Sequence, residues 1–206
     1  FSSNSRTTDT AINNAVGENP QSTDTKTGFY IVKANTHMGL FNTLKNAIPT
    51  TRLEGWADWM ENDQHKAMCI ENGCIKLGAS SLTGDIVTPV LSCLSGKATI
   101  EVQFDAAPYV EGSSEAWDPL NGRVDVFDNT TVSSYTLPVA TAPVQTKEWT
   151  LAEKYEWQHF TVTVSGVTPT SRIGIGAFRK DGDANIGKTQ ARMYLDNIQI
   201  KVLNYE

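Results

Sequence analysis

The sequence predicts an all-β protein, an antiparallel β-sandwich of the jelly-roll type with one short N-terminal helix. Several segments alternate apolar and polar residues, and clusters of Gly, Asn, Asp and Pro separate these segments. Helical periodicity is missing after Pro49, which favours a sandwich over a mixed fold. The 206 residues suffice for one such domain with a substantial core, which we expect over residues 52–206.

The first 51 residues differ in composition from the rest of the chain. Residues 1–26 are mostly Thr, Ser, Asn, Asp and Gln, so we expect a polar linker or tail that cannot order itself. Residues 27–51 form an expected N-terminal extension. Within it, Gly28–Ala34 (GFYIVKA) predicts a short strand, and apolar residues at three- and four-residue spacing between Thr36 and Pro49 predict a short helix.

The clearest strand prediction is KATIEVQFDA, residues 97–106. Its apolar residues occupy every second position, so one face is expected in the core and the other in water. The same alternation predicts strands in HFTVTVSG, in SRIGIGAF and, more briefly, around residue 125. The residues expected to point inward are Ala98, Ile100, Val102, Phe104, Val124, Val126, Phe160, Val162, Val164, Ile173, Ile175 and Ala177.

The last predicted strand changes the face that its apolar residues occupy. Met193 and Leu195 share one alternation phase, and Ile198, Ile200 and Val202 share the other. The change falls at Asp196-Asn197, which predicts two half-strands joined at a bulge. We expect this segment to complete a sheet, because an unpaired edge of aliphatic residues promotes aggregation.

Shorter signals lie between residues 52 and 97. Asn72-Gly73 between two apolar runs predicts a hairpin turn, and Pro89 confines its segment to a sheet edge or to the start of a strand. Cys69 and Cys74 flank the hairpin, so they could form a disulfide across it or remain buried free thiols. A zinc site is not expected, since a second cysteine pair and a histidine pattern are both missing.

Charge and hydropathy exclude several classes of partner. The net charge is −6, and the basic residues are scattered, which argues against nucleic acid. No apolar run approaches the roughly eighteen residues of a membrane span. The chain does not begin with Met, so we expect a processed form or a piece of a larger protein, with any export signal or lipid anchor upstream. A cytosolic protein is the alternative.

Sequence motifs of catalysis are missing. The chain has no nucleophile elbow, zinc-protease helix or phosphate-binding loop, and we interpret His37, His65 and His159 as isolated, with His159 pointing to solvent. Paired carboxylates for glycoside cleavage can come from anywhere in a sequence. The first acids to test for that role, predicted on water-facing sides of strands, are Glu101, Asp105, Asp125 and Asp128.

Five segments in this order, RLEGWADW, GCIKLGASSLTGDIVTPVL, KATIEVQFDA, EWQHFTVTVSG and RMYLDNIQIKV, carry a family likeness. From Arg52 to Leu203 the chain resembles the galactose-binding-domain-like jelly rolls, in particular carbohydrate-binding modules of Bacteroidetes surface proteins. The resemblance implies a structural calcium held by Glu54 and Asp196, and oxygen ligands suit that ion. Asn197 stands where the family often has a second carboxylate. An Asp196 that caps the bulge through hydrogen bonds is the alternative.

A predicted loop offers a candidate sugar site. Trp117 lies in PYVEGSSEAWDPLNGR, with Tyr109, Asp118 and Asn121 close by. A sugar ring has C–H groups on its faces and hydroxyls on its rim, so an aromatic surface beside amide and carboxylate groups suits it. Packing within the loop and a protein interface are the alternatives for Trp117.

The leading hypothesis is a non-catalytic carbohydrate-binding module or accessory domain of an exported bacterial cell-surface protein. It would bind a polysaccharide or oligosaccharide by aromatic stacking and hydrogen bonds, without a cofactor beyond structural calcium. We expect it outside the cell or at the bacterial surface, as on an outer-membrane lipoprotein, beside other domains of a larger parent protein. The alternatives are a structural or adhesive sandwich module that binds a protein partner and, third, a glycan-active hydrolase or lyase.

Overall fold

A computed structural model describes residues 55–59, 67–69, 75–77, 84–108, 120–132, 136–137, 141–153, 156–176 and 193–206. These residues are strands and their connections, and none of them belongs to a helix, so a membrane-spanning helix is not found among them. The predicted strand at 28–34 and helix at 36–49 lie outside the described residues. The strands are β1 (Asp58–Trp59), β2 (Ala67–Cys69), β3 (Ile75–Leu77), β4 (Asp85–Val87), β5 (Ala98–Pro108), β6 (Leu120–Phe127), β7 (Thr136–Leu137), β8 (Gln145–Leu151), β9 (Gln158–Val167), β10 (Arg172–Gly176) and β11 (Met193–Tyr205).

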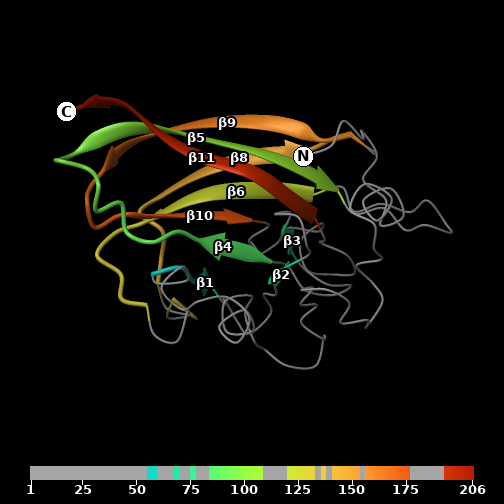
Figure 1. Ribbon diagram of the computed structural model, residues 1–206, viewed down its shortest axis with the longest axis horizontal. Coiled ribbons are helices and arrows are strands. Elements are labelled where there is room, and N and C mark those ends of the chain that lie inside the picture. The colour runs from blue at the N-terminus through green and yellow to red at the C-terminus, as the bar shows by residue number, and fades with distance from the viewer. Residues whose placement is uncertain are drawn as a thin grey trace, which may run out of the picture.

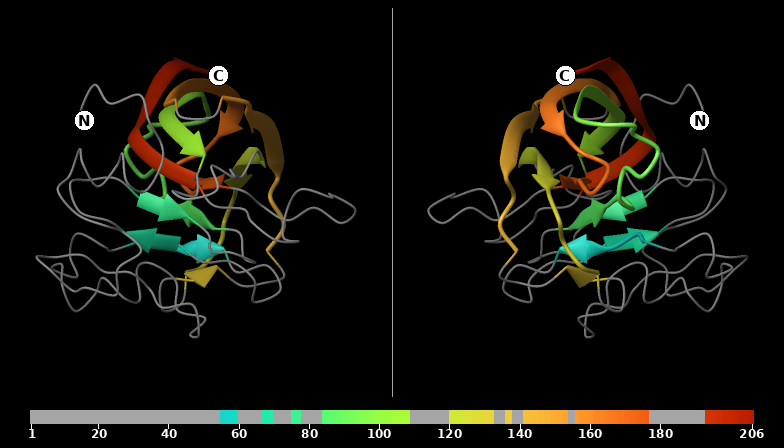
Figure 2. Two further views of the ribbon diagram at one scale, coloured as in Figure 1. Left: turned by 90° about the vertical axis from the view of Figure 1, so that its right-hand side faces the viewer. Right: turned by 90° about the vertical axis from the view of Figure 1, so that its left-hand side faces the viewer.

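Two antiparallel sheets form the body of the protein (Figure 1). One has four strands in the order β4-β10-β6-β8, and the other has five in the order β2-β3-β11-β5-β9. A small parallel pair, β1 with β7, lies next to the four-stranded sheet, because Ala57 before β1 forms a bridge with Val87 of β4 (Figure 2). The all-β class and the antiparallel sandwich are therefore confirmed.

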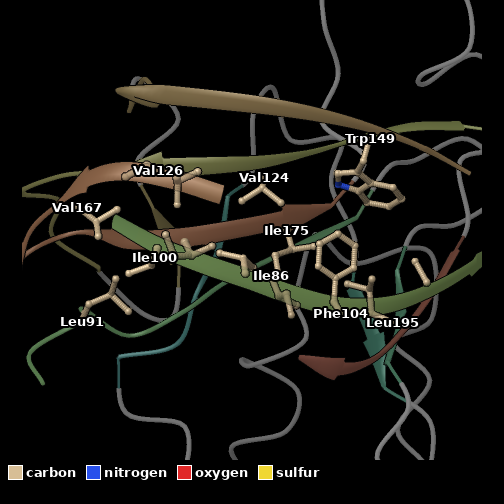
Figure 3. Packing of buried hydrophobic residues seen from close by; sticks show 14 of the residues in the cluster. Ile86, Leu91, Ile100, Phe104, Val124, Val126, Trp149, Val167, Ile175 and Leu195 are labelled. Carbon is tan, nitrogen blue, oxygen red and sulfur yellow. The ribbon is translucent and has the colours of Figure 1, made fainter. Parts of the chain in front are cut away.

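The core fills the space between these sheets (Figure 3). The four predicted inward residues of β5 are fully buried, and so are Val124 of β6 and both isoleucines of β10. Phe160 and Val162 of β9 are only partly buried, but they pack against the same cluster, and Val164 is fully buried. The alternation therefore assigned the correct face wherever the structure describes the residue; Ala177 lies outside the described residues.

The bulge predicted in the last strand is present. β11 is continuous from Met193 to Tyr205, and its register against β5 shifts between Asp196 and Gln199. Asn197 has a φ of 53°, a left-handed conformation that Asn tolerates better than most residues. Leu195 before the bulge and Ile198 after it both reach the core. β11 lies between β3 and β5, so it completes the five-stranded sheet as expected.

The predictions for residues 69–93 have mixed outcomes. β4 ends at Val87, before Pro89, and is an edge strand, as predicted. β2 and β3 pair in antiparallel fashion on either side of Asn72-Gly73, which fits the hairpin, although the turn itself lies outside the described residues. Cys93, in the connection between β4 and β5, is free and exposed. The state of Cys69 and Cys74 stays untested.

Three aromatic rings fill one end of the core. Phe104 lies edge-on to Trp149 with ring centroids 5.2 Å apart, and Phe160 stacks on Phe104 at 5.4 Å. Gly122 is directly opposite Trp149 in the β6–β8 pair. A Cβ atom at Gly122 would lie 2.1 Å from the indole ring, so the ring occupies the space that any other side chain would need.

Asp128 joins the end of β6 to the turn between β9 and β10. Its Oδ1 accepts hydrogen bonds from Thr168 at 3.0 Å, Thr170 at 2.9 Å and Ser171 at 3.3 Å. Burial by itself raises the pKa of Asp128, but these hydroxyls and the Asn129 amide outweigh it and hold the pKa below the usual 3.8. Asp128 therefore has a structural role in this connection.

Gly122→Ala should destabilise the protein by about 1–3 kcal/mol, because the added methyl displaces the Trp149 ring from a well-packed core. Gly96→Ala is the matched control, since nothing lies within 4 Å of a Cβ atom at that position. Urea unfolding of both variants and the parent measures the difference. Equal midpoints for the two variants would contradict the close contact between Gly122 and Trp149.

Asp128→Asn should lower stability at pH 7 by about 1 kcal/mol, since charged acceptors make stronger hydrogen bonds than neutral ones. Because the pKa of Asp128 is lower in the folded state, its carboxylate stabilises the folded protein at pH values above the unfolded pKa of 3.8. This stabilisation is lost as pH falls through the folded pKa. The difference between parent and variant should therefore vanish in acid. Thermal unfolding between pH 2 and 8, with Glu156→Gln as an exposed-acid control, tests this; a difference that persists at the lowest pH contradicts it.

Candidate functional site

The predicted sugar-site loop connects the two sheets. It begins after Pro108 at the end of β5, in the five-stranded sheet, and ends at Leu120 at the start of β6, in the four-stranded sheet. Tyr109, Trp117 and Asp118 lie outside the described residues. Both ends of the loop are nevertheless attached to long strands that contribute buried residues to the core. Binding residues are often found on loops that a rigid scaffold holds in this way.

Asn121 is the predicted sugar-site residue that the structure describes. It is partly exposed and lies opposite Thr150 of β8, whose hydroxyl donates to Asn121 Oδ1 at 2.8 Å. This hydrogen bond uses the amide oxygen and fixes the orientation of the group. Among the described residues, no hydrogen-bond partner is found for the amide nitrogen, which has two donor hydrogens.

Further polar residues continue from Asn121 along the same face of β6. Arg123 lies opposite Glu148, and Asp125 lies opposite Thr146. The Arg123 Nε atom is 3.7 Å from Asp125 Oδ2, and the Thr146 hydroxyl donates to Asp125 Oδ1. On the other side, the β10 residues opposite Arg123 and Asp125 are Gly176 and Gly174.

The prediction that Asp125 faces water is wrong. Its side chain is fully buried, although it points away from the core between the sheets as the alternation required. Alternation shows only which side of a sheet a residue occupies, and it cannot show that this side is covered. On β4 and β10 the outward-facing Asp85 and Arg172 are buried as well. Asp125 is therefore not an accessible catalytic carboxylate in this structure.

The interpretation of His159 as an isolated histidine is also wrong. The side chain is 57% exposed, as predicted, but its Nδ1 lies 2.7 Å from Asp105 Oδ1. Asp105 Oδ2 accepts a second hydrogen bond, from Asn197 Nδ2, at 2.7 Å. The two residues lie opposite each other in the β5–β9 pair. Both occupied the outward phase in the sequence, but that pattern does not reveal the register between two strands.

Asp196, the predicted metal ligand in the last strand, lies directly opposite Asp105 in the β5–β11 pair. Its Oδ1 accepts from the Asn197 amide at 2.8 Å, while the buried Oδ2 has no hydrogen-bond partner among the described residues. Burial raises the pKa of Asp196; the Asn197 hydrogen bond opposes this rise, and the negative charge of Asp105 adds to it. Asp196 therefore caps the bulge, as the alternative predicted, but it does so through Oδ1 alone.

The calcium prediction fits Asp196 in its chemistry. A cation would compensate a buried carboxylate that neighbours another acid, and the oxygen without a partner is a suitable ligand. Glu54 lies outside the described residues, but Gly55, which follows it, is tied to the four-stranded sheet by Arg172, which donates to its carbonyl at 2.5 Å. Among the described residues, groups of three or more potential metal ligands are not found.

Asp196→Asn should raise stability at pH 7 in the presence of a chelator. The pKa of Asp196 is raised in the folded state, so the free energy of unfolding falls as pH rises from the unfolded pKa to the folded pKa. An amide does not ionise, so Asp196→Asn does not lose this free energy. The gain should disappear below the unfolded value of 3.8, where Asp196 is protonated in both states. Thermal unfolding from pH 3 to 8 measures it, with Glu153→Gln as the exposed control.

Calcium provides the second part of this measurement. If Asp196 binds the ion, added calcium raises the Tm of the parent and of Glu153→Gln but leaves Asp196→Asn unchanged. A calcium response of equal size in all three proteins would contradict Asp196 as a ligand. Equal stability of Asp196→Asn and the parent at pH 7 in chelator would contradict the burial argument.

Comparisons with known proteins return similar solved structures at low sequence identity. No family model matches the chain, and no curated protein matches it. A CBM22-2 xylan-binding domain of Paenibacillus barcinonensis Xyn10C is 13% identical with a TM-score of 0.44, over 73% of this chain and 92% of that one. An adhesin domain of Lys-gingipain from Porphyromonas gingivalis is 16% identical with a TM-score of 0.44, over 78% and 96%.

A third similar structure is TmCBM61 in complex with β-1,4-galactotriose. It is 9% identical with a TM-score of 0.42, over 73% of this chain and 90% of that one. Carbohydrate-binding modules thus recur among the solved structures, as the family likeness in the sequence implied. With identities of 9–16% and TM-scores of 0.42–0.44, these matches assign no ligand to this chain.

Proposed function

We propose that the chain is a non-catalytic carbohydrate-binding module or accessory domain, which binds a polysaccharide or oligosaccharide at the loop between β5 and β6. The observation that supports this is the position of Asn121. Thr150 orients its amide at the end of a loop whose two ends are attached to different sheets. The same loop contains Trp117, Tyr109 and Asp118.

The binding mode follows from the chemistry of these side chains. An aromatic ring offers its face to the C–H groups of a sugar ring, while an oriented amide and a carboxylate bond the hydroxyls on the rim. Such contacts discriminate sugars by hydroxyl geometry and leave the ligand unchanged. We expect modest affinity, since a site made by one loop and the end of a strand buries little surface.

The cellular setting belongs to this proposal. The family likeness of the sequence supports an exported protein at a bacterial surface, with other domains in the same parent chain and a structural calcium at Glu54 and Asp196. Scattered basic residues and a net charge of −6 also suit a polysaccharide better than nucleic acid. Xylan and β-1,4-galactotriose, for which two of the similar domains are named, are the first sugars to test.

Trp117→Ala should weaken binding of a responsive glycan about tenfold or more, since loss of 1.4 kcal/mol corresponds to a factor of about ten. Asn121→Ala should weaken it less, because one neutral hydrogen bond contributes about 0.5–1.5 kcal/mol. Calorimetric titration with xylan, β-1,4-galactotriose and a panel of plant and host glycans measures both. Val144→Ala, an exposed apolar position outside this loop, is the control and should bind like the parent.

Two results would contradict the assignment. The first is that the parent binds none of the glycans. The second is that Trp117→Ala binds as tightly as the parent, which would leave the loop as a structural connection and move the search to another surface.

A glycan-active hydrolase or lyase is the second candidate, and one observation favours it. Asp105 holds the ring of the exposed His159 through Nδ1, which is how a general base is oriented. Chromatography of the same glycans after incubation distinguishes the two candidates. Cleavage that is lost in His159→Gln would assign catalysis to this pair, whereas intact glycan with retained binding supports the binding module.

A further inference from the structure

The second half of β11 is paired along only one edge. β5 pairs with β11 from Met193 to Tyr205, whereas β3 pairs only with its first three residues, Met193–Leu195. Figure 1 shows β11 running past β3 toward the C-terminus. Within the described part of the chain, no strand lies on the other side of Ile198–Tyr205. A strand edge of this length exposes a row of unpaired amides and carbonyls.

The same half-strand leaves apolar side chains in water. Ile198 and Ile200 face the core yet are only partly buried, and Val202 in the same row is 38% exposed. Their neighbours on β5, Ile100 and Val102, are fully buried. Leu203 and Tyr205 are 45% and 50% exposed, so three of the four exposed large apolar residues among those described gather here. The core therefore ends uncovered at this edge.

We propose that Gly28–Ala34 of the same chain pairs with β11 as an additional edge strand over Ile198–Tyr205. This segment reads GFYIVKA and is the most apolar run of the first 54 residues. Its seven residues match the eight of the open edge, and its β-branched and aromatic residues suit a strand. Both of its alternating faces carry apolar side chains, so in either register it covers the exposed row.

The connection is long enough to allow this pairing. Residues 35–54 separate the segment from Gly55, and even with the predicted helix between Thr36 and Pro49 they span about 40 Å. A compact chain of this length has a radius of gyration of about 17 Å, so the linker can reach any surface of the domain. Gly55 itself is anchored, since Arg172 donates to its carbonyl.

The chain's own segment is favoured over a second copy of the protein. A tethered strand meets the edge at an effective concentration in the millimolar range, which separate molecules do not reach in dilute solution. The proposal extends the domain toward residue 28, beyond the boundary at 52 that the sequence suggested. It is independent of the proposed sugar site, which lies at the loop between β5 and β6.

Nuclear Overhauser measurements on the unmodified full chain test the pairing directly. We expect backbone contacts between Gly28–Ala34 and Ile198–Tyr205 that do not change with dilution. Their absence in a chain whose β5–β11 contacts are present overturns the proposal. Contacts that disappear on dilution, or that arise between differently labelled chains, identify a second copy as the occupant and also overturn it.

Amide exchange with a matched pair of variants gives a second test. Ile31→Pro removes a donor and fixes the backbone within the proposed strand, while Thr23→Pro places the same residue in the polar tail. In the parent and in Thr23→Pro, the Ile198–Tyr205 amides that β5 does not bond should be protected. In Ile31→Pro, these amides should exchange at least tenfold faster. The exchange rates of the Ile100–Phe104 amides should stay the same, which checks that the variant is folded. Equal rates in all three proteins overturn the proposal.

Discussion

The change of face within β11 is the constraint on which the five-stranded sheet depends. Residues on both sides of Asn197 must reach one core, and a regular strand cannot bring Leu195 and Ile198 to the same side. A left-handed residue resolves this conflict by adding one position to one strand. The bulge also directs the Asn197 side chain onto Asp105, which in turn holds His159. One local backbone choice therefore sets both the register and the polar network of the outer face.

Much of the fold could be predicted because the pattern that encodes it is local. Alternation identified the inward face of β5, β6, β9 and β10, the phase change located the bulge, and Pro89 marked an edge. What the pattern omits is the identity of the neighbouring strand. The pairing of Asp105 with His159 and the burial of Asp125 both depend on it, so sequence reasoning missed both. The small parallel pair of β1 and β7 gave no signal, since each strand has only two residues.

The candidate site divides in a similar way. Trp117 and Asn121 were singled out by composition, and the structure adds the Thr150 hydrogen bond that orients one of them. The predicted calcium ligands concern stability and not sugar recognition. Arg172 already ties the Gly55 and Thr88 carbonyls together at β10, whereas the buried Asp196 Oδ2 has no hydrogen-bond partner among the described residues. An ion at that carboxylate would act on stability and leave sugar selectivity to the loop.

The bulge also limits which residue types are tolerated at position 197. Glycine would adopt the left-handed backbone with less strain, but it would remove the donor that engages Asp105. Aspartate would tolerate the backbone and bring a third negative charge beside Asp105 and Asp196. A β-branched residue would oppose the backbone itself. Asparagine meets both demands, so we expect few substitutions at this position even though the side chain is exposed.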